Sequence, residues 1–372
     1  MTSLLTAPSA APPVEAAPLG GRPKTRLYTL DGLRLLAALM VVCFHFIGFD
    51  NWDASPWGAS TRKLFPDAHY AAAYGWLGVQ LFFLISGFVI CMSCWGRSLQ
   101  QFAVSRLLRL YPAYWFAVLL TSGVLLLTGR LDAVPDTLSK ILSNLTMLQE
   151  PIGAGDIDPV YWTLWAELRF YLLFALVAAL GLTYRRVLYF CGLWLLMTVL
   201  APHAGIPLLE IFAMPDAAPF FVGGILMFLM HRFRPTLALW ILLGASWILA
   251  QGQLRNMMKS AETSVHHRLS WTICLVVISV FYVVVLAVAI KRTPLFNYRW
   301  LTTAGALTYP LYLLHEELGW EIIRSLHSHV SPWLLVTGIT ALMLLAAWLV
   351  HRFVERPAVR AMKRRIAPQL AG

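Results

Sequence analysis

Long apolar segments follow one another along almost the whole chain, separated by short stretches of polar and turn-forming residues. A helix that crosses a bilayer needs about 20 mostly apolar residues, so each segment is predicted as a transmembrane helix. Some segments are short or interrupted, and one pair is also compatible with a re-entrant hairpin. The predicted segments are 33–49, 75–95, 113–128, 162–182, 187–201, 217–230, 236–250, 270–290, 301–319 and 333–350. The pattern therefore predicts an all-α, polytopic membrane protein of about ten transmembrane helices.

The composition agrees with this prediction. Hydrophobic residues make up 59% of the 372 residues and charged residues only 13%, with a mean hydropathy of +0.68. Soluble domains carry about 25% charged residues, so a water-soluble fold is excluded. The formal net charge of +11 would suit a nucleic-acid partner. The distribution of the basic residues along the chain, however, has another explanation.

Membrane topology explains the distribution of the basic residues. If the N-terminus is cytoplasmic and ten spans alternate, twenty of the 29 Lys and Arg residues fall on the cytoplasmic side and Arg169 falls within a span. The eight on the opposite side are Arg62, Lys63, Arg130, Lys140, Arg255, Lys259, Arg268 and Arg324. This asymmetry follows the positive-inside rule. We expect a multi-pass protein of the inner (cytoplasmic) membrane with both termini in the cytoplasm, surrounded by membrane lipid and binding no nucleic acid.

The domain organisation is simple. Residues 1–26 are rich in Ala and Pro and lack the basic start and apolar core of a signal peptide, which predicts a disordered cytoplasmic tail. Residues 27–356 form one predicted transmembrane domain, because no stretch is long and polar enough for a second folded domain. Residues 357–372 are predicted as a basic cytoplasmic tail.

Two ionisable residues lie in the first apolar segment, LDGLRLLAALMVVCFHF. Arg34 and His45 are eleven residues apart, so on a helix they differ by about 20° in direction and about 16 Å in height. They therefore share a face, with His45 deeper in the membrane. Intramembrane ionisable residues are by default functional hypotheses. The alternative is a snorkelling arginine, with Asp31 as a local partner, and a packed histidine.

Further candidates lie later in the chain. In RLLRLYPAYW, Arg106 and Arg109 neighbour each other on a helix face and suit phosphate groups, although a topological anchor would look the same. In WTLWAELRFY, Glu167 can orient a histidine from another helix or form a structural ion pair, and Arg169, two residues on, points another way. GALTYPLYLLHEELGW places His315 within a span broken by Pro310.

Nucleophilic and metal chemistry have weaker signals. Ser86 is not in a nucleophile elbow, and Cys91 and Cys94 have no second cysteine pair or nearby histidine, which favours membrane-core packing. No metal site is predicted.

Taken in order, these segments resemble the acyltransferase family 3 membrane proteins, which modify sugars and other hydroxyl-bearing acceptors. The resemblance rests on DGLRLLAALMVVCFHF with its Arg-x10-His pattern, FFLISGF, the RLLR motif before YP, WTLWAELRFY, YPLYLLH and the terminal VERP. It implies that Arg34 and His45 are the motif pair and that Arg106 and Arg109 are the RxxR pair. It also implies an acyl-CoA donor bound from the cytoplasm. Family members more often have WSL followed by two acidic residues, whereas here Leu168 follows Glu167.

A compatible mechanism uses these residues. Arg34, Arg106 and Arg109 would hold the phosphates of acyl-CoA, a co-substrate, and the pantetheine arm would carry the thioester towards His45. A neutral His45 would act as general base on an acceptor hydroxyl, or take the acyl group itself. Neither a metal nor a permanently bound cofactor is required.

The acceptor is less defined. A carbohydrate or lipid-linked glycan is expected, and Asp156, Asp158, Tyr161 and Trp162 would suit a sugar, although interfacial aromatic residues are expected in any case. Acetyl is the default acyl group because it is the commonest in the family. The alternative function is a transporter or flippase with His45, Glu167 and His315 as relay groups, although no internal repeat supports it. A non-catalytic scaffold is the third possibility.

Overall fold

The structure is a computed structural model that describes residues 27–51, 54–131, 135–290, 298 and 300–366. Within these ranges the chain forms helices and no strand, which confirms the predicted all-α class. The tail predicted at 1–26 and the end of the basic tail, 367–372, lie outside the described residues.

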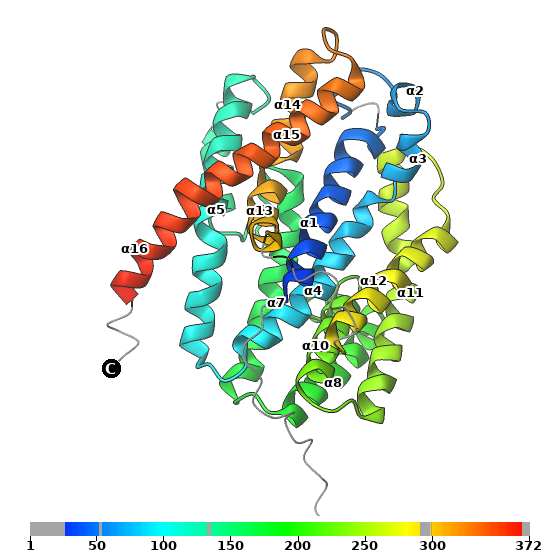
Figure 1. The fold of residues 1–372 in the computed structure, drawn as a ribbon, viewed down its shortest axis with the longest axis vertical. Coiled ribbons are helices and arrows are strands. Elements are labelled where there is room, and N and C mark those ends of the chain that lie inside the picture. The colour runs from blue at the N-terminus through cyan, green and yellow to red at the C-terminus, as the bar shows by residue number, and fades with distance from the viewer. Residues whose placement is uncertain (1–26, 52–53, 132–134, 291–297, 299, 367–372) are drawn as a thin grey trace, which may run out of the picture.

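The helices follow one another with short connections (Figure 1). In chain order they are α1 (Tyr28–Cys43), α2 (Thr61–Leu64), α3 (Ala68–Ala72), α4 (Gly78–Cys94), α5 (Leu99–Leu127), α6 (Pro135–Leu145), α7 (Trp162–Ala179), α8 (Tyr184–Ala204), α9 (Pro207–Ala213), α10 (Ala218–Arg232), α11 (Leu237–Val265), α12 (Trp271–Ala289), α13 (Leu301–Leu314), α14 (Glu316–Leu326), α15 (Pro332–Val350) and α16 (Arg356–Ile366). Two π-helical turns, η1 (Phe44–Gly48) and η5 (His351–Glu355), extend α1 and connect α15 to α16.

Nine helical runs among the described residues are long and apolar enough to cross a membrane. They coincide with nine of the ten predicted segments. The tenth, 301–319, is divided at His315 into α13 and α14, each too short to span alone. The two helices differ in charge: α13 carries no charged residue, whereas the first turn of α14 carries Glu316 and Glu317.

The third span begins much earlier than residue 113. Ser98 caps α5, accepting a hydrogen bond from the Gln101 backbone N–H at 3.2 Å, and Gln101 accepts one in return from the Ser98 N–H at 3.3 Å. This capping box starts the helix, which then runs through Pro112. As a result Arg106 and Arg109 lie within the helix rather than before it.

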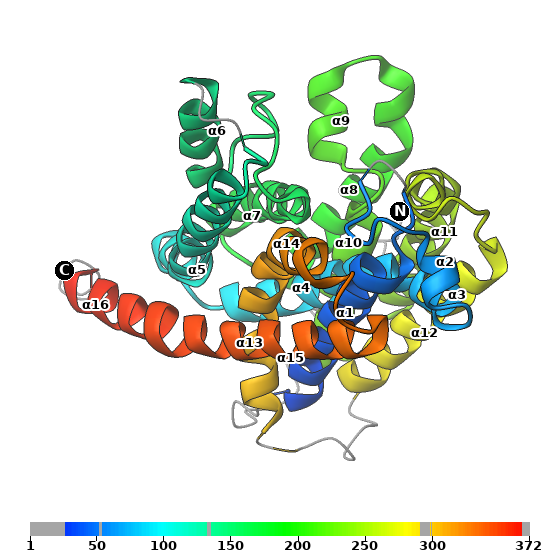
Figure 2. The same cartoon turned by 90° about the horizontal axis from the view of Figure 1, so that it is seen from above.

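The centre of the molecule is a tight packing of α1, α4, α10 and α13 (Figures 1 and 2). Helices α4 and α10 approach backbone to backbone. A Cβ atom at Gly87 would lie 2.0 Å from the Phe221 carbonyl oxygen, and one at Gly224 would lie 1.9 Å from that of Leu84. Small residues allow this close approach, which is a common way for membrane helices to associate.

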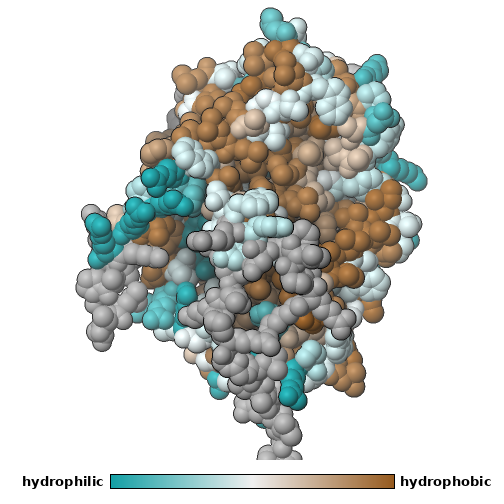
Figure 3. Space-filling model, viewed as in Figure 1, coloured by the Kyte–Doolittle hydropathy of each residue, from teal (hydrophilic) through white to brown (hydrophobic). Residues whose placement is uncertain are grey.

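The exterior matches a lipid environment. Hydrophobic residues cover broad areas of the face drawn in Figure 3, and hydrophilic residues gather near α16. Figure 2 shows α15 and α16 as one long run across the bundle, with α16 projecting beyond it. The basic segment at the C-terminal end therefore lies at the edge of the apolar body.

Candidate active site

His45 lies in the π-helical turn η1, at the end of α1. A π-turn leaves carbonyl groups without their α-helical partners, and here two indoles take them up. Trp57 Nε1 donates to the Phe46 carbonyl at 2.9 Å, and Trp320 Nε1 donates to the His45 carbonyl at 3.1 Å. Single π-helical turns within α-helices occur frequently at functional sites. Two tryptophans thus fix the backbone that carries His45.

The imidazole of His45 has two polar neighbours, one on each nitrogen. Nδ1 lies 2.9 Å from Nε2 of His315, whose own Nδ1 lies 2.9 Å from the Tyr312 carbonyl oxygen. Nε2 of His45 lies 3.6 Å from Oε2 of Glu316. His315 is completely buried and Glu316 is 3% exposed. From the sequence, His315 was expected only as a relay group in the alternative function, and no role was expected for Glu316.

His45 and Glu316 line a cavity of about 610 Å³, which we call the histidine cavity. Its wall also includes Trp162, Asp216 and Asn256, contributed by α7, the loop before α10 and α11. The combination of a basic nitrogen, an aromatic ring and polar groups suits a small polar ligand with hydroxyl groups.

A second cavity, of about 310 Å³, collects the arginines of the two motifs and is called here the arginine cavity. Arg34 from α1 and Arg106 and Arg109 from α5 line it together with Glu167. The guanidinium carbon of Arg106 lies 5.9 Å from the Phe102 and Tyr171 ring centres, and that of Arg109 lies 5.6 Å from the Tyr309 ring centre. These stacked positions hold the charged groups in place.

Glu167 lines the arginine cavity. It does not contact His45, although an orienting role would require such a contact. Its Oε1 accepts hydrogen bonds from Ser86 Oγ at 2.7 Å and from the Tyr171 hydroxyl. The carboxyl group facing His45 belongs to Glu316 instead. Arg169 does point elsewhere, as its spacing predicted, because it stacks on Trp165 and donates to the Ile211 carbonyl at 2.8 Å.

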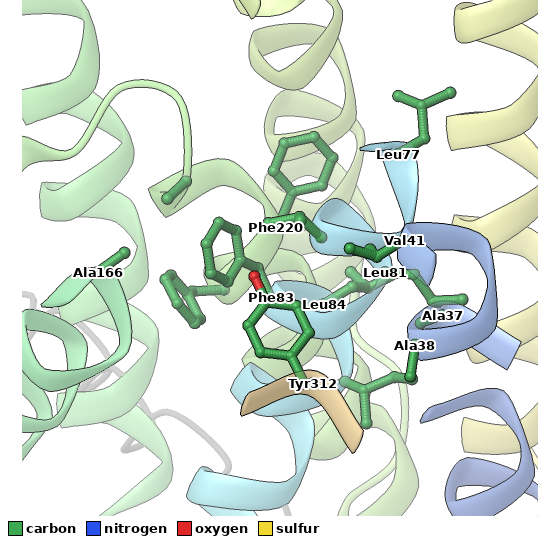
Figure 4. Close-up of a cluster of buried hydrophobic side chains, with 14 of the residues drawn as sticks. Ala37, Ala38, Val41, Leu77, Leu81, Phe83, Leu84, Ala166, Phe220 and Tyr312 are labelled. Atoms are coloured by element: carbon green, nitrogen blue, oxygen red, sulfur yellow. The ribbon is translucent and has the colours of Figure 1, made fainter. Parts of the chain in front are cut away.

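Val79, Phe83 and Tyr312 line both cavities, and these three residues are called the septum. Phe83 and Tyr312 belong to the buried cluster drawn in Figure 4, where α4 and α13 meet. The Tyr312 hydroxyl accepts a hydrogen bond from Thr163 at 2.9 Å. Arg34 and His45 therefore line different cavities, one on each side of the septum.

Further cavities adjoin these two. At one end Arg34 and Arg109 also line a cavity of about 360 Å³ with His351 and Arg356. At the other end, a cavity of about 710 Å³ shares Trp162 and Asp216 with the histidine cavity, and Arg169 also lines it. The four cavities thus adjoin in series through shared lining residues, from a basic one at His351 to one that holds both Arg169 and acidic residues.

The loop proposed for sugar binding is mostly structural. Asp158 and Tyr161 are fully buried, and Asp158 caps the turn before α7 by accepting from the Val160 N–H at 3.2 Å. Burial raises the pKa of Asp156 to about 7, and its hydrogen bond with Glu150 acts in the same direction. Of the four residues, only Trp162 is among those lining the histidine cavity.

The fold and the site together define a polytopic membrane protein in which a septum of three side chains separates an arginine-lined cavity from a polar cavity lined by a histidine. The family model described as an acyltransferase domain matches residues 27–352. The chain belongs to this family, acyltransferase family 3, and it is a membrane acyltransferase. Comparisons with curated proteins and with solved structures gave no significant match.

Proposed function

We propose that the protein transfers an acyl group, acetyl by default, from cytoplasmic acyl-CoA to a hydroxyl group of a cell-envelope or exopolysaccharide sugar. The observation that carries the proposal is the position of His45, which faces a polar cavity next to a septum with three arginines behind it. Paired guanidinium groups suit the phosphates of CoA, and an imidazole suits proton transfer from a hydroxyl.

The donor would enter at the arginine cavity. Arg34, Arg106 and Arg109 would bind its phosphates, and the pantetheine arm would pass the septum to bring the thioester carbonyl to His45. This direction of entry requires the arginine end to be cytoplasmic, which is the orientation favoured by the distribution of basic residues. In the proposed orientation both termini would lie in the cytoplasm and the protein would span the inner membrane.

The acceptor would occupy the histidine cavity. Nε2 of His45 would take the proton of the acceptor hydroxyl while its oxygen attacks the thioester carbonyl. When the tetrahedral intermediate collapses, the carbon–sulfur bond breaks and the CoA thiolate takes the proton from the His45 imidazolium. The carboxyl group of Glu316, 3.6 Å away, would stabilise that imidazolium. Direct acylation of His45 is the other route open to the same atoms.

A transporter in which His45, Glu167 and His315 relay protons is less well supported. Glu167 hydrogen-bonds Ser86 and Tyr171 in the arginine cavity, and the septum separates this cavity from the one that His45 lines.

The first test compares His45→Ala with the wild type and with His329→Ala, which removes an exposed histidine outside the cavities. Binding of acetyl-CoA and transfer of labelled acetyl to a glycan-containing membrane extract are measured on each. We expect His45→Ala to bind the donor and to lose transfer, while His329→Ala keeps both. Transfer that persists in His45→Ala would refute the mechanism. Failure of the wild type to bind or transfer would refute acetyl-CoA as the donor.

A further inference from the structure

We propose that His315 is a positioning residue that holds His45 in the tautomer whose Nε2 is unprotonated and ready to accept a proton. The proposal deepens the acyl-transfer function and rests on it. A series of hydrogen bonds supports it, beginning at the Tyr312 backbone carbonyl and ending at the histidine cavity.

The first step is the tautomer of His315. Its Nδ1 lies 2.9 Å from the Tyr312 carbonyl oxygen. A carbonyl oxygen only accepts hydrogen bonds, so Nδ1 of His315 must carry a hydrogen and donate it. The contact joins residues three apart on the same helix, so it does not depend on how the neighbouring helices pack.

The second step is the free nitrogen of His315. The residue is completely buried, and an imidazolium without a paired carboxylate would be costly there. In the neutral ring only one nitrogen carries a hydrogen, and Nδ1 has it. Nε2 of His315 is therefore an acceptor.

The third step transfers this constraint to His45. Nδ1 of His45 lies 2.9 Å from that acceptor, so it must donate. Neutral His45 then has no hydrogen on Nε2, the nitrogen that faces Glu316 at the histidine cavity. A backbone carbonyl thus determines, through His315, which nitrogen of His45 is the base.

The arrangement also serves the charged state. After Nε2 takes the acceptor proton, both nitrogens of His45 are donors. Nδ1 keeps its bond to His315, and Nε2–H faces the carboxyl group of Glu316. His315 thereby fills the place that a buried carboxylate takes in a Ser-His-Asp triad, where the third group fixes the tautomer of the base.

The test uses two substitutions of His315 that differ in one property. His315→Gln can present its side-chain carbonyl oxygen as an acceptor near the former Nε2, whereas His315→Leu has no acceptor. We expect kcat for acyl transfer to fall on the order of 10²-fold in His315→Leu, with the KM for acetyl-CoA changed little. His315→Gln should recover most of this loss. Thermal melting of both proteins in detergent checks that they remain folded.

A direct measurement separates this proposal from the proposed function. Solid-state NMR of the full chain in lipid bilayers, with ¹⁵N,¹³C-labelled histidine, reports which ring nitrogen of His45 is protonated, and the His45 signals are assigned by their loss in His45→Asn. We expect Nδ1–H in the wild type and in His315→Gln, and a substantial Nε2–H population in His315→Leu.

The outcomes are distinct. A wild-type His45 with Nε2–H overturns the proposal, as does an unchanged kcat in a folded His315→Leu. An equal loss of kcat in both variants also overturns it, because a merely structural role would not distinguish an acceptor from its absence. If the wild type transfers no acyl group, the proposed function fails, yet the NMR result still decides the tautomer.

Discussion

Oε2 of Glu316 lies 3.6 Å from Nε2 of His45 and has no hydrogen-bond partner among the described residues. A buried polar atom without a partner costs free energy, and such atoms in native structures call for an explanation. A positive charge that forms on His45 during turnover gives this oxygen its partner. The pair is therefore better suited to a transient imidazolium than to the resting state.

Glu316→Gln should lower kcat by roughly 10- to 100-fold, because the amide keeps the shape but can carry no negative charge to stabilise the imidazolium. The KM for acetyl-CoA should change little. Steady-state kinetics with labelled acetyl-CoA measures both constants. Glu317→Gln is the matched control, since the Glu317 carboxylate lies 3.8 Å from Arg324 instead. Equal effects of the two substitutions would contradict this role for Glu316.

Arg109→Gln should raise the KM for acetyl-CoA by about 10- to 100-fold, since a hydrogen bond to a charged group contributes about 1.5–3 kcal/mol. Arg109 lines the arginine cavity and the adjoining basic one. The value of kcat at saturating donor should be little changed. Arg97→Gln removes an exposed arginine just before α5 and should leave the KM unaltered. A raised KM in both variants would indicate a general effect of surface charge.

Gly87→Ala should lower the melting temperature by roughly 2–8 °C, because overpacking costs about 1–3 kcal/mol and the Phe221 carbonyl lies in the way of a Cβ. Differential scanning fluorimetry in detergent measures the change. Gly244→Ala in α11 is the counterpart, since nothing lies within 4 Å of its Cβ and alanine favours a helix interior. It should raise the melting temperature slightly. A similar fall in both variants would argue against close packing of α4 and α10.

Asp156→Asn should make the protein less sensitive to alkaline pH. The raised pKa means that the folded state binds a proton more tightly than the unfolded state, so this stabilisation is full below about pH 4 and is lost as pH rises towards 7. Asparagine can still accept the Gln149 hydrogen bond. We expect a gain of roughly 1–2 °C at pH 8, after allowance for solvent screening, and little change at pH 4. An equal gain at both pH values would refute the titration of Asp156 as the cause.

Much of the fold could be predicted from periodicity and composition. Nine predicted segments coincide with long apolar helices, because bilayer thickness imposes nearly the same length on each. The spacing of Arg34 and His45 predicted a shared face on an ideal α-helix, whereas in the structure His45 lies in the π-helical turn that follows α1. The start of α5 was predicted too late, because Arg106 and Arg109 lower the local hydropathy while the cap at Ser98 is a local hydrogen-bond feature.

The partners of His45 could not be predicted, because they depend on how α1 and α13 pack. The His45–His315 contact joins residues 270 positions apart. Glu167 lies in a family-like motif and was expected to orient a histidine from another helix or to form an ion pair. Glu316 had no such motif and only followed a histidine in the sequence. One available signal was the sequence HEE inside a predicted apolar span, since ionisable residues are costly there and mark functional sites.

The septum has a consequence for the membrane itself. A bilayer keeps ions apart with about 30 Å of hydrocarbon. If water fills both cavities, the septum is the only layer that separates them. The membrane voltage then falls across these few side chains. Each elementary charge carried through that layer gains or loses about 2.3 kcal/mol per 100 mV. Such a protein therefore has to block ion leakage while it catalyses transfer. The binding free energy of a donor with several phosphates would also depend on the membrane potential.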